Sequence, residues 1–496
     1  MHIFKRGSVV NTAEIVLPSR LSELVNDKHS KLNATLVKGR ACPQNNRQLI
    51  ALVKAAATEG DKVCIAGGRH AMGGQQFLQN GLLVDTTELN QVIHFDGARG
   101  LVEVQAGMRW PELVSFLRSQ PGSSWAIRQK QTGCDSLSIG GALSANIHGR
   151  GLGQAPFVSD VEEFKIVTAD GELRLCSRTQ NSELFSLAIG GYGLFGLIAS
   201  ATLRLAPRRR LRRNVQIVGS DQAVQKLEEQ ATAGASHGDF QFNIDDRSED
   251  FLQSGILSTY TPLTAEQENQ NQNQDQNQNQ NLNLNLNHSP KELSSEDWRE
   301  LIYLAHCDKK KAYEKYLRHY LTTDGQTYWS DVFQLSTYVE HYHPDIDRNM
   351  HSEHVGSELI SELYVPRSQM GSFLRRAADV LRSHKASVIY GTVRLIEEDS
   401  ETFLPWAKEP WACVVFNLHV DHCEEGLTAA KKSFGALIDL AIELGGSYYL
   451  TYHRFAEANQ LKACYPMMAE FLRLKDHYDP DRIFVSDWYG HILKQV

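Results

Sequence analysis

The first segment suited to hold a ligand is AGGRHAMGGQQF (66–77), which sets two glycine pairs around Arg69 and His70. It follows a short apolar run, KVCIAGG (62–68), that is typical of a buried strand entering a glycine turn. Such a loop can present successive backbone N–H groups to a pyrophosphate, and the His70 ring could meet the same ligand. The alternative is an ordinary glycine turn that carries a surface histidine.

A second loop of the same kind is QTGCDSLSIGGALSANIHGRGLG (131–153). Its small residues would let a ligand lie against the backbone. The side chains of Asp135, Ser136 and Asn146 could hydrogen-bond that ligand. His148 lies in the same loop and is followed by a glycine. Taken alone, this loop indicates a ligand without identifying it.

A third segment, GGYGLFG (190–196), matches the Gly-x-Gly-x-x-Gly pattern of dinucleotide-binding turns. That pattern should follow a strand and open a helix. Here it precedes the strand-like IASATLRL and has no acidic residue at the expected distance. The Rossmann interpretation is therefore rejected.

A cluster of histidines raises the question of a metal site: His341, His343, His351 and His354. Their spacing matches no standard ligand set, so the sequence predicts no metal. The 8 cysteines are scattered without a Cys-x-x-Cys pair and are typical of reduced thiols in a cytosolic protein.

Both helices and strands are predicted around these loops. Helical periodicity marks NRQLIALVKAAATE (46–59) and WPELVSFLRS (110–119). Strand-like segments bounded by Gly, Asp and Asn lie at 62–68, 81–87, 101–107, 164–175 and 196–205. Of the 36 glycines, 20 lie between Gly67 and Gly196, so the close backbone approaches are concentrated in this region. The mixture predicts an α+β class.

Two compositional features mark the middle of the chain. The basic run RRRLRR (208–213) follows Pro207 and suggests a boundary; it is either a solvated connector or strand edge, or a site that attracts an anion. From Gln267 to His288 the chain is almost pure Asn and Gln. Such a segment cannot bury a core, so we expect a disordered surface insertion at about 265–289 with no catalytic role.

The C-terminal half repeats a strand and helix order. Strands are predicted at 358–366, 387–396, 411–420 and 447–455, and helices at 367–384 and 426–444. This ferredoxin-like order suits an antiparallel sheet covered by helices on one face. A further helix is predicted at 465–477.

Overall composition excludes several classes of protein. The chain of 496 residues is too long for one compact core, and its net charge of −8 argues against a nucleic-acid binder. The N-terminus lacks the apolar stretch of a secretory signal. No apolar run reaches the roughly 20 residues that a membrane span needs. We therefore expect a cytoplasmic protein without a transmembrane segment.

Five segments in order resemble the FAD-binding domain of the vanillyl-alcohol oxidase family, also called the PCMH type. They are AGGRHAMGG, LLVDTTELN (82–90), VEVQAGMRWPELVSFL (102–117), SIGGALSANIHG (138–149) and GGYGLFGLIASATLRL (190–205). The resemblance implies a two-lobed protein. An FAD-binding domain would cover 1–205 and a substrate or cap domain 206–450, and segment 451–496 would return to the FAD-binding domain.

The resemblance also implies FAD as the cofactor and assigns its contacts. Loop 66–71 would hold the pyrophosphate, the 132–148 loop would line the flavin, and Gly193 and Ile198 would meet the adenine side. The implied set is Ala66, Gly67, Gly68, Arg69, His70, Ala71, Thr132, Gly133, Ser136, Gly140, Gly141, Asn146, His148, Gly193 and Ile198. In several members a histidine in Gly-x-x-His-Ser carries the flavin covalently. His70 is the matching position, but Ala71 replaces the serine, so a covalent bond through His70 is left open.

Within the family, the C-terminal half resembles sugar-oxidising members. ACYPMMAEFLRLKDHYDPDRIFVSDWY (463–489) is similar to the usual end of aldonolactone and alditol oxidases. SIGGALSANIHGRG and VTADGELRLCS are similar to decaprenylphosphoryl-ribose oxidases. Arg394 and Cys413 match flavin-facing positions of such members. Where the ribose oxidases have a lysine, this chain has His453 and Arg454, so the lipid-linked ribose is not assigned.

Flavin oxidation of an alcohol moves a hydride to N5 and a proton from the hydroxyl to a base. We predict His453 as that base and Arg394 as the cation that stabilises the developing anion. The remaining side chains would orient hydroxyls or hold the arginine. The predicted catalytic set is His453, Arg394, Tyr390, Tyr452, Glu362 and Cys413. Each has a structural alternative: packing for the tyrosines, a satisfied core position for the histidine, and a small buried hydrophobe for the cysteine.

The expected activity is FAD-dependent oxidation of a CH–OH group in a sugar, polyol or aldonolactone. Its partners would be that small molecule and O2 or another electron acceptor, with no nucleic acid, in a monomer or homodimer. One alternative is an FAD-dependent C=C reductase like the sterol reductases, which would require NADPH. Another is a catalytically inactive binding protein on the same fold, which would purify colourless.

Overall fold

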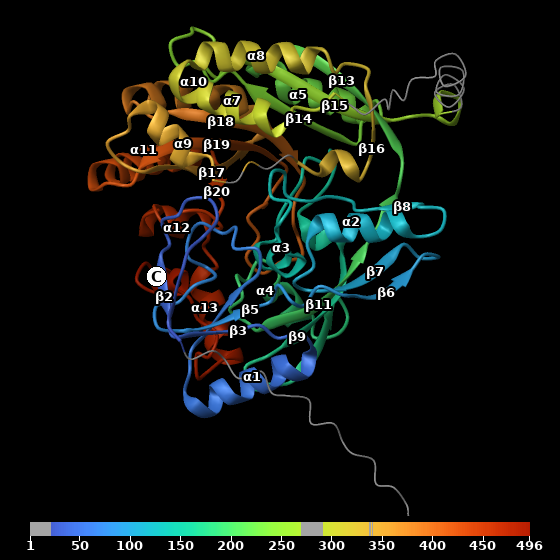
Figure 1. The fold of residues 1–496 in the computed structure, drawn as a ribbon, viewed down its shortest axis with the longest axis vertical. Helices are drawn as coiled ribbons and strands as arrows, with labels where there is room; N and C mark the ends of the chain where they lie inside the picture. Colours follow the sequence, from blue (N-terminus) through green and yellow to red (C-terminus); the bar gives the residue numbers. More distant parts are fainter. Residues whose placement is uncertain (1–20, 269–290, 337–338, 340) are drawn as a thin grey trace, which may run out of the picture.

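The structure, a computed structural model, describes residues 21–268, 291–336, 339 and 341–496. Its elements form two lobes, one above the other in Figure 1. The N-terminal residues 1–20 and nearly all of the predicted Asn/Gln-rich insertion lie outside the described residues. The α+β class predicted from the sequence is confirmed, since both lobes combine sheets with packed helices.

Two sheets organise the lower lobe. The larger is antiparallel and runs in the order β10 (Leu173–Ser177), β9 (Val161–Val167), β11 (Leu197–Arg204), β7 (Leu101–Gln105) and β6 (Val92–Asp96). The smaller is parallel, in the order β3 (Gly39–Ala41), β5 (Leu82–Asp85) and β4 (Val63–Ala66). Two-stranded pairs add β1 (Glu23–Val25) with β2 (Thr35–Val37), and β8 (Trp125–Ala126) with β12 (Ala206–Pro207).

Four helices of the first half pack in this lobe. Helices α1 (Asn46–Glu59) and α2 (Trp110–Ser119) confirm the predicted bounds. The Asn45 side chain caps α1 by accepting a hydrogen bond from the Gln48 N–H at 3.1 Å. The buried leucines and valine of α1 face the sheets. Helices α3 (Ile139–Ala145) and α4 (Ser182–Ala188) were not predicted, because both are short and lie beside glycine turns.

The end of the chain packs against this same lobe. It forms α12 (Ala458–Cys464), α13 (Met468–Tyr478) and α14 (Asp487–Ile492), drawn in red in Figure 1. Between α13 and α14, the Val63 N–H donates to the Ile483 carbonyl at 2.7 Å, and the Val485 N–H donates to the Val63 carbonyl at 3.0 Å. The last segment is therefore tied to β4, the strand that leads into the first glycine loop.

One antiparallel sheet organises the upper lobe. Its order is β16 (Thr327–Trp329), β13 (Arg210–Gly219), β15 (Ser254–Pro262), β14 (His237–Phe242), β18 (Val388–Ile396), β19 (Trp411–Asp421), β17 (Gly356–Pro366) and β20 (Ser447–Tyr448). The basic run 208–213 enters β13, which pairs with β16 on one side and β15 on the other, so the run is not at a strand edge. The chain passes from the lower to the upper sheet between β11 and β13.

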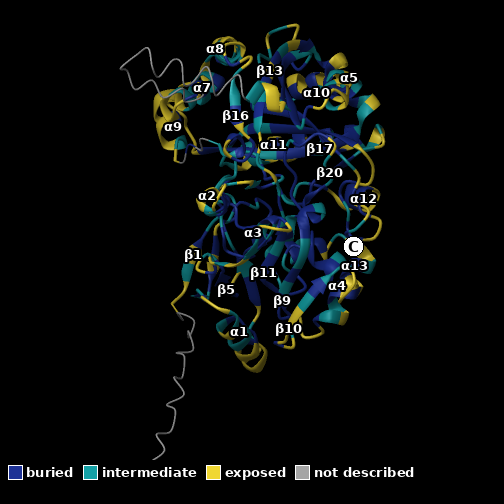
Figure 2. Ribbon diagram, turned by 90° about the vertical axis from the view of Figure 1, so that its right-hand side faces the viewer, coloured by how far each residue is buried: buried dark blue, intermediate teal, exposed yellow. Residues whose placement is uncertain are grey.

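Helices cover both faces of the upper sheet, not one face as the sequence predicted. Helices α5 (Ser220–Thr232), α10 (Met370–Ser383) and α11 (Glu424–Glu443) form one layer. Helices α7 (Ser295–Cys307), α8 (Lys309–Leu321) and α9 (His343–Met350) lie on the opposite side (Figures 1 and 2). The ferredoxin-like pattern did not predict this second layer of helices, which forms a wall inside the upper lobe.

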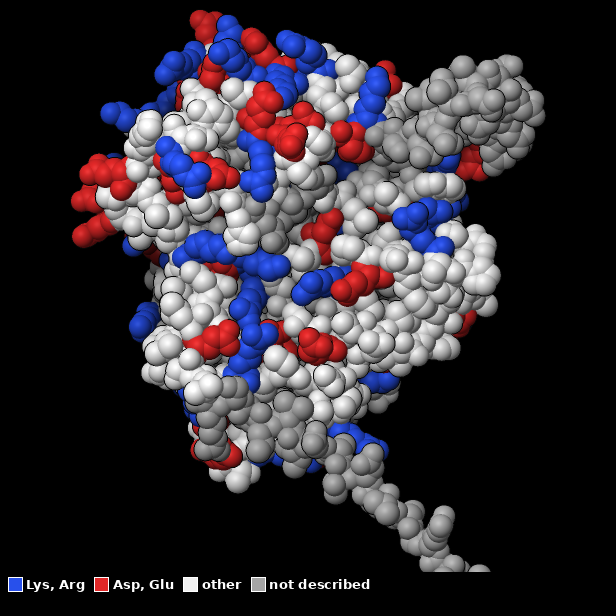
Figure 3. Space-filling view, viewed as in Figure 1, with Lys and Arg blue, Asp and Glu red and all other residues white. Residues whose placement is uncertain are grey.

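The predicted strand 447–455 is mostly wrong. Only Ser447–Tyr448 pair with β17, and residues 449–455 run as turns and irregular chain toward the lower lobe. Among the described residues, no helix combines the length and apolar character that crossing a bilayer requires. Lys and Arg as well as Asp and Glu side chains occur on both lobes of the face shown in Figure 3.

Candidate functional site

A large cavity of about 1930 Å³ is lined by residues of both lobes. Its lower wall contains the glycine loops at 67–71 and 131–134 and the small residues that begin α3. Its upper wall comes from β17, β18, α7 and α8. On β17 the residues alternate: Glu358 and Glu362 line the cavity, whereas Leu363 is buried on the other face.

The first glycine loop leaves a row of backbone donors unused. Within the described part of the chain, the N–H groups of Gly68, Arg69, His70 and Ala71 donate no hydrogen bond to a protein group. Arg69 has a φ of 60°, and such a left-handed residue within a turn gathers successive N–H groups into an anion-binding concavity. The guanidinium of Arg69 pairs with Asp85 at 3.1 Å, so this residue serves the cavity through its backbone.

Close packing explains why this loop needs glycine. A Cβ on Gly67 would lie 2.1 Å from the Ser138 Oγ. A Cβ on Gly68 would lie 2.3 Å from the Ser136 backbone oxygen. The two glycine loops therefore pack closely against each other at the floor of the cavity.

Most of the predicted cofactor contacts line the cavity, and four do not. The lining members are Gly67, Gly68, Arg69, His70, Ala71, Thr132, Gly133, Gly140, Gly141, Gly193 and Ile198. The others, Ala66, Ser136, Asn146 and His148, are not among its lining residues. Asn146 is committed to the fold, since its Nδ2 donates to Asp399 at 2.8 Å and its Oδ1 accepts from the Val158 N–H at 2.9 Å.

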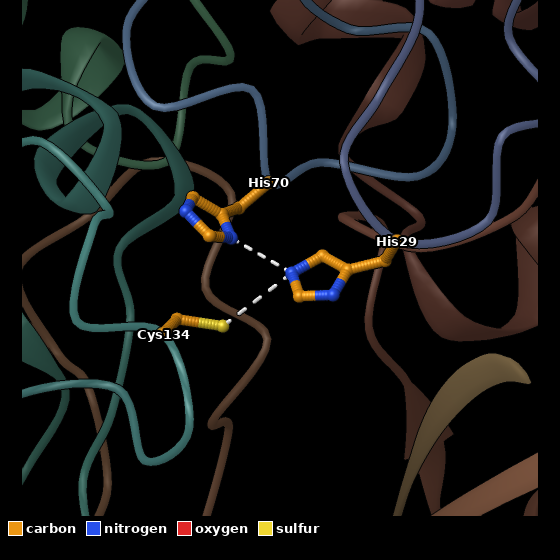
Figure 4. Close-up of side chains that lie close together, drawn as sticks. All are labelled: His29, His70 and Cys134. Carbon is orange, nitrogen blue, oxygen red and sulfur yellow. Dashed lines mark hydrogen bonds between the residues drawn. The ribbon is translucent and has the colours of Figure 1, made fainter. Parts of the chain in front are cut away.

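His70 lies in a small polar cluster at the cavity (Figure 4). Its Nδ1 is 2.7 Å from the Nε2 of His29, and its Nε2 is 2.8 Å from the Ser136 Oγ. Ser136 also accepts a hydrogen bond from Lys28 at 3.1 Å. Burial, together with the nearby His29 and Lys28, lowers the pKa of His70 well below its usual value, so the ring is neutral at pH 7.

The partners of His70 could not be identified from the sequence. The His29 Nε2 is also 3.7 Å from the Cys134 Sγ, so a histidine from the N-terminal segment joins the two loops. His29 lies in NDKHSK, which shows neither periodicity nor a motif. Cys134 lies within the second glycine loop and could have been noted as a cavity residue from its position.

Glu362 is the centre of the polar upper wall. Its Oε1 accepts from the Tyr452 hydroxyl at 2.8 Å and from the Gln131 Nε2 at 3.3 Å. Its Oε2 lies 2.8 Å from the His148 Nε2. Burial acts to raise the pKa of Glu362, but the charge and hydrogen bond of His148 and the charge of Arg394 lower it to about 2. The carboxylate is therefore ionised at neutral pH.

Arg394 is a buried cation with hydrogen-bond donors that the described protein groups leave unused. The residue is 4% exposed and lines the cavity, yet its Nε and Nη1 atoms have no hydrogen-bond partner among the described residues. Burial works against its charge, and the Glu362 carboxylate outweighs burial and raises the pKa of Arg394. Buried donors without partners are costly, so this pair of nitrogens is suited to a ligand oxygen.

Two other predicted catalytic residues take different places. Tyr390 lines the cavity on β18, four residues before Arg394. Cys413 is fully buried and is not among the lining residues; its Sγ lies 3.8 Å from the His148 Nε2, behind Glu362. Burial and the Glu362 charge raise the pKa of Cys413 well above its usual value, so it is a neutral packing residue.

The structure does not place His453 where the sequence predicted the base. Its ring stacks between Phe434 and Phe455, at centroid distances of 4.1 and 4.4 Å, and it is absent from the cavity lining. Both ring nitrogens are buried, with no hydrogen-bond partner in the part of the chain that the structure describes, and burial lowers the pKa of His453 to about 3. The cause is the early end of β20, which turns this segment away from the sheet.

Comparison with known proteins gives two family matches. Residues 37–177 match the FAD binding domain, and residues 332–492 match D-arabinono-1,4-lactone oxidase. The chain is 23% identical over 451 residues to decaprenylphosphoryl-beta-D-ribose oxidase of Mycolicibacterium smegmatis, covering 88% of this chain and 91% of that protein.

Other relatives match over the N-terminal part only. An uncharacterized oxidoreductase in the fasciation locus of Rhodococcoides fascians is 28% identical over 201 residues, which are 40% of this chain and 43% of that protein. Cytokinin dehydrogenase 3 of Oryza sativa subsp. japonica is 31% identical over 176 residues, which are 34% of this chain and 32% of that protein. The chain thus spans less than half the length of these two relatives.

The cavity fits the cofactor of the matched family. FAD is a dinucleotide with a pyrophosphate, and the unused N–H groups of residues 68–71 form an anion cradle within the matched region. Glycines 67, 68, 140 and 141 keep the adjoining floor free of side chains. FAD is therefore the cofactor. The first glycine loop and the 131–141 segment have the geometry to hold it.

Proposed function

Because this chain belongs to the family of FAD-linked oxidoreductases with a PCMH-type FAD-binding domain, we propose that it oxidises a CH–OH group of a sugar, polyol or aldonolactone. Bound FAD supplies the acceptor of the hydride. One observation carries the proposal: an ionised Glu362 and an Arg394 with two unused hydrogen-bond donors line the same cavity wall. A neutral, hydroxyl-rich ligand needs an acceptor and a donor of this kind.

Glu362 is the group we assign to the reacting hydroxyl. As an ionised carboxylate it can only accept hydrogen bonds, so it orients a hydroxyl donor and receives its proton as the carbonyl forms. Tyr452 and Gln131 hold its Oε1, and His148 holds its Oε2. A low pKa makes Glu362 a weak base, and its function is therefore mainly to position the hydroxyl.

Arg394 is assigned to the oxygen that gains negative character or to a neighbouring hydroxyl. Its Nε and Nη1 are free to donate, and their burial strengthens the interaction because little water competes. Tyr390, on the same strand, is placed to contact a further hydroxyl of the substrate. Together these side chains would fix which carbon presents its hydrogen to the flavin.

The test is an anaerobic reductive half-reaction. The purified protein is mixed with alditols, aldoses and aldonolactones in turn, and with NADPH, while the flavin absorbance is followed. Bleaching by one of the polyhydroxy compounds supports the proposal, and subsequent O2 uptake identifies an oxidase. Bleaching by NADPH alone would favour the C=C reductase. A colourless protein would contradict both.

His453→Leu is the matched control for the base. Because the ring of His453 packs between two phenylalanines away from the cavity, this variant should reduce the flavin at the wild-type rate. If the variant kept its full FAD content but reduced the flavin much more slowly than the wild type, His453 would be the base.

A further inference from the structure

A second polar cluster lies on the same cavity wall, away from the Glu362 site. Glu358 on β17 is surrounded by three imidazoles from three elements: His306 near the end of α7, His343 at the start of α9, and His419 on β19. The His306 Nε2 lies 2.9 Å from Glu358 Oε1, the His419 Nδ1 lies 3.8 Å from Oε1, and the His343 Nε2 contacts Oε2.

These side chains are well enclosed but reach the cavity. Their exposed fractions are 4% for Glu358, 5% for His306, 15% for His343 and 20% for His419. Glu358 and His343 are among the cavity-lining residues. Glu358 and His419 are direct partners in the register of β17 and β19, so the sheet itself fixes two of the four positions.

From this arrangement we infer a binding site for one divalent transition-metal ion, with His306, His419 and Glu358 as ligands and one coordination position open. Ligand atoms of His306, Glu358 and His419 all lie within 4.8 Å of one another. Ligands around tetrahedral zinc lie roughly 3.4 Å apart, given metal–ligand distances of about 2.0–2.1 Å. The side chains therefore need only small rotations to close on an ion.

The far side of one imidazole points to the same role. The His419 Nε2 lies 3.3 Å from Asp421 Oδ1. A carboxylate behind an imidazole fixes the ring and its tautomer, leaving the opposite nitrogen to the metal. A simple hydrogen-bonded cluster around Glu358 does not require carboxylates behind its donors.

The donor set selects the class of ion. Two imidazole nitrogens and one carboxylate oxygen suit Zn²⁺ or Co²⁺, whereas Mg²⁺ and Ca²⁺ prefer oxygen ligands. The sequence predicted no metal, because these residues lie far apart in the chain and none of them belonged to the histidine cluster it considered.

The position of the site separates it from the Glu362 chemistry. Glu358 and Glu362 are four residues apart on β17, which is roughly 13 Å at about 3.3 Å per residue. A metal ion here would hold an oxygen of the substrate remote from the bond being oxidised. It would not replace Glu362 or Arg394.

The test uses untagged holoenzyme freed of metal with a chelator and then titrated with Zn²⁺ or Co²⁺. We expect one ion per chain by elemental analysis and Co²⁺ bands to the red of the flavin absorption. Glu358→Gln and the His306→Ala/His419→Ala double variant should lose the ion. Asp421→Asn should weaken binding by roughly 10-fold, as expected for a carboxylate behind a ligand. His354→Ala, an exposed neighbour, is the matched control.

Flavin absorbance reports folding in each variant, so loss of metal with FAD retained is informative. A second readout is the thermal midpoint, which Zn²⁺ should raise in the wild type and not in Glu358→Gln. Stoichiometric binding that persists in the double variant would overturn the assignment. Absence of binding by the folded wild type would show that the cluster is held by hydrogen bonds alone.

Discussion

The Nε2 atom of His148 lies 2.8 Å from Oε2 of Glu362, and each side chain is only 1% exposed. The other ring nitrogen of His148 faces the Gly149 carbonyl oxygen at 3.0 Å. The Oε1 atom of Glu362 accepts from Tyr452 at 2.8 Å and from Gln131 at 3.3 Å, so His148 holds the opposite oxygen of the same carboxylate.

Replacing that carboxylate should remove turnover without removing the cofactor. In Glu362→Gln the shape is kept but the acceptor for the substrate hydroxyl is weakened. We expect the rate of flavin reduction to fall by roughly 10²-fold, the loss typical of a misplaced substrate. The measurement is stopped-flow bleaching by the substrate found in the panel. Glu470→Gln, which breaks an exposed pair with Arg473, should behave as the wild type.

The first glycine loop makes a separate prediction about cofactor retention. In Gly68→Ala the new Cβ would lie 2.3 Å from a backbone oxygen, so the two loops must move apart. We expect a cost of roughly 1–3 kcal/mol in stability and a lower FAD content after gel filtration. Gly435→Ala is the control, because it lies within α11 with nothing within 4 Å of its Cβ. Equal FAD content in both variants would show that the loop does not hold the dinucleotide.

Whether a feature could be predicted from the sequence depends on how far apart along the chain its interacting residues lie. Helix α1 follows from neighbours along the chain and could be predicted. The glycine turn at 67–68 could be recognised from the sequence, but the contacts that require it come from Ser136 and Ser138 in the second loop. The misassignment of His453 arose because YYLTYHRF has strand-forming residues, while the end of β20 is set by tertiary packing.

The parts of the site that escaped prediction depend on distant contacts. His29 meets His70 across 41 residues, and His306 meets Glu358 across 52. Neither histidine lies in a motif, so only the folded chain brings each to its partner. Glu362 was named from the sequence, but its partnership with His148, 214 residues away, could be seen only in the structure.

Covalent attachment of FAD through His70 can be tested by acid precipitation. His70 is neutral and its Nδ1 faces His29, so the ring is nucleophilic and has a partner that can take its proton. We propose that wild-type flavin colour stays with the acid pellet. In His70→Ala the colour should move to the supernatant. Yellow supernatant from the wild type would show that FAD is bound without a covalent bond.

The pH dependence of stability should contain a contribution from His237. Burial, with the nearby charge of Arg150, lowers the pKa of His237 to about 3, against 6.5 for the unfolded chain. Between these values the unfolded state binds the extra proton, so this stabilising contribution is complete above pH 6.5 and is lost as pH falls toward 3. The slope approaches about 1.4 kcal/mol per pH unit.

The corresponding variant is His237→Gln, which keeps a polar side chain beside Ser236. Urea unfolding at several pH values between 7 and 4 should show a steeper decline in the wild type than in this variant. Parallel declines would mean that His237 is protonated in the folded protein. His94→Gln, at an exposed position on β6, should leave the decline unchanged.

Arg394 should show opposite effects on stability and on catalysis. The protein leaves two of its buried nitrogens without partners, so Arg394→Met removes an unsatisfied polar group and keeps much of the volume. Against this, Glu362 loses a neighbouring positive charge but retains His148, Tyr452 and Gln131. We therefore expect a thermal midpoint equal to or above that of the wild type, and a roughly 10²- to 10³-fold fall in kcat/KM. Arg394→Lys should restore little, because a lysine cannot reproduce the planar set of donors. A strong loss of stability in Arg394→Met, with kcat/KM unchanged, would make this arginine a structural partner of Glu362 instead of a substrate contact.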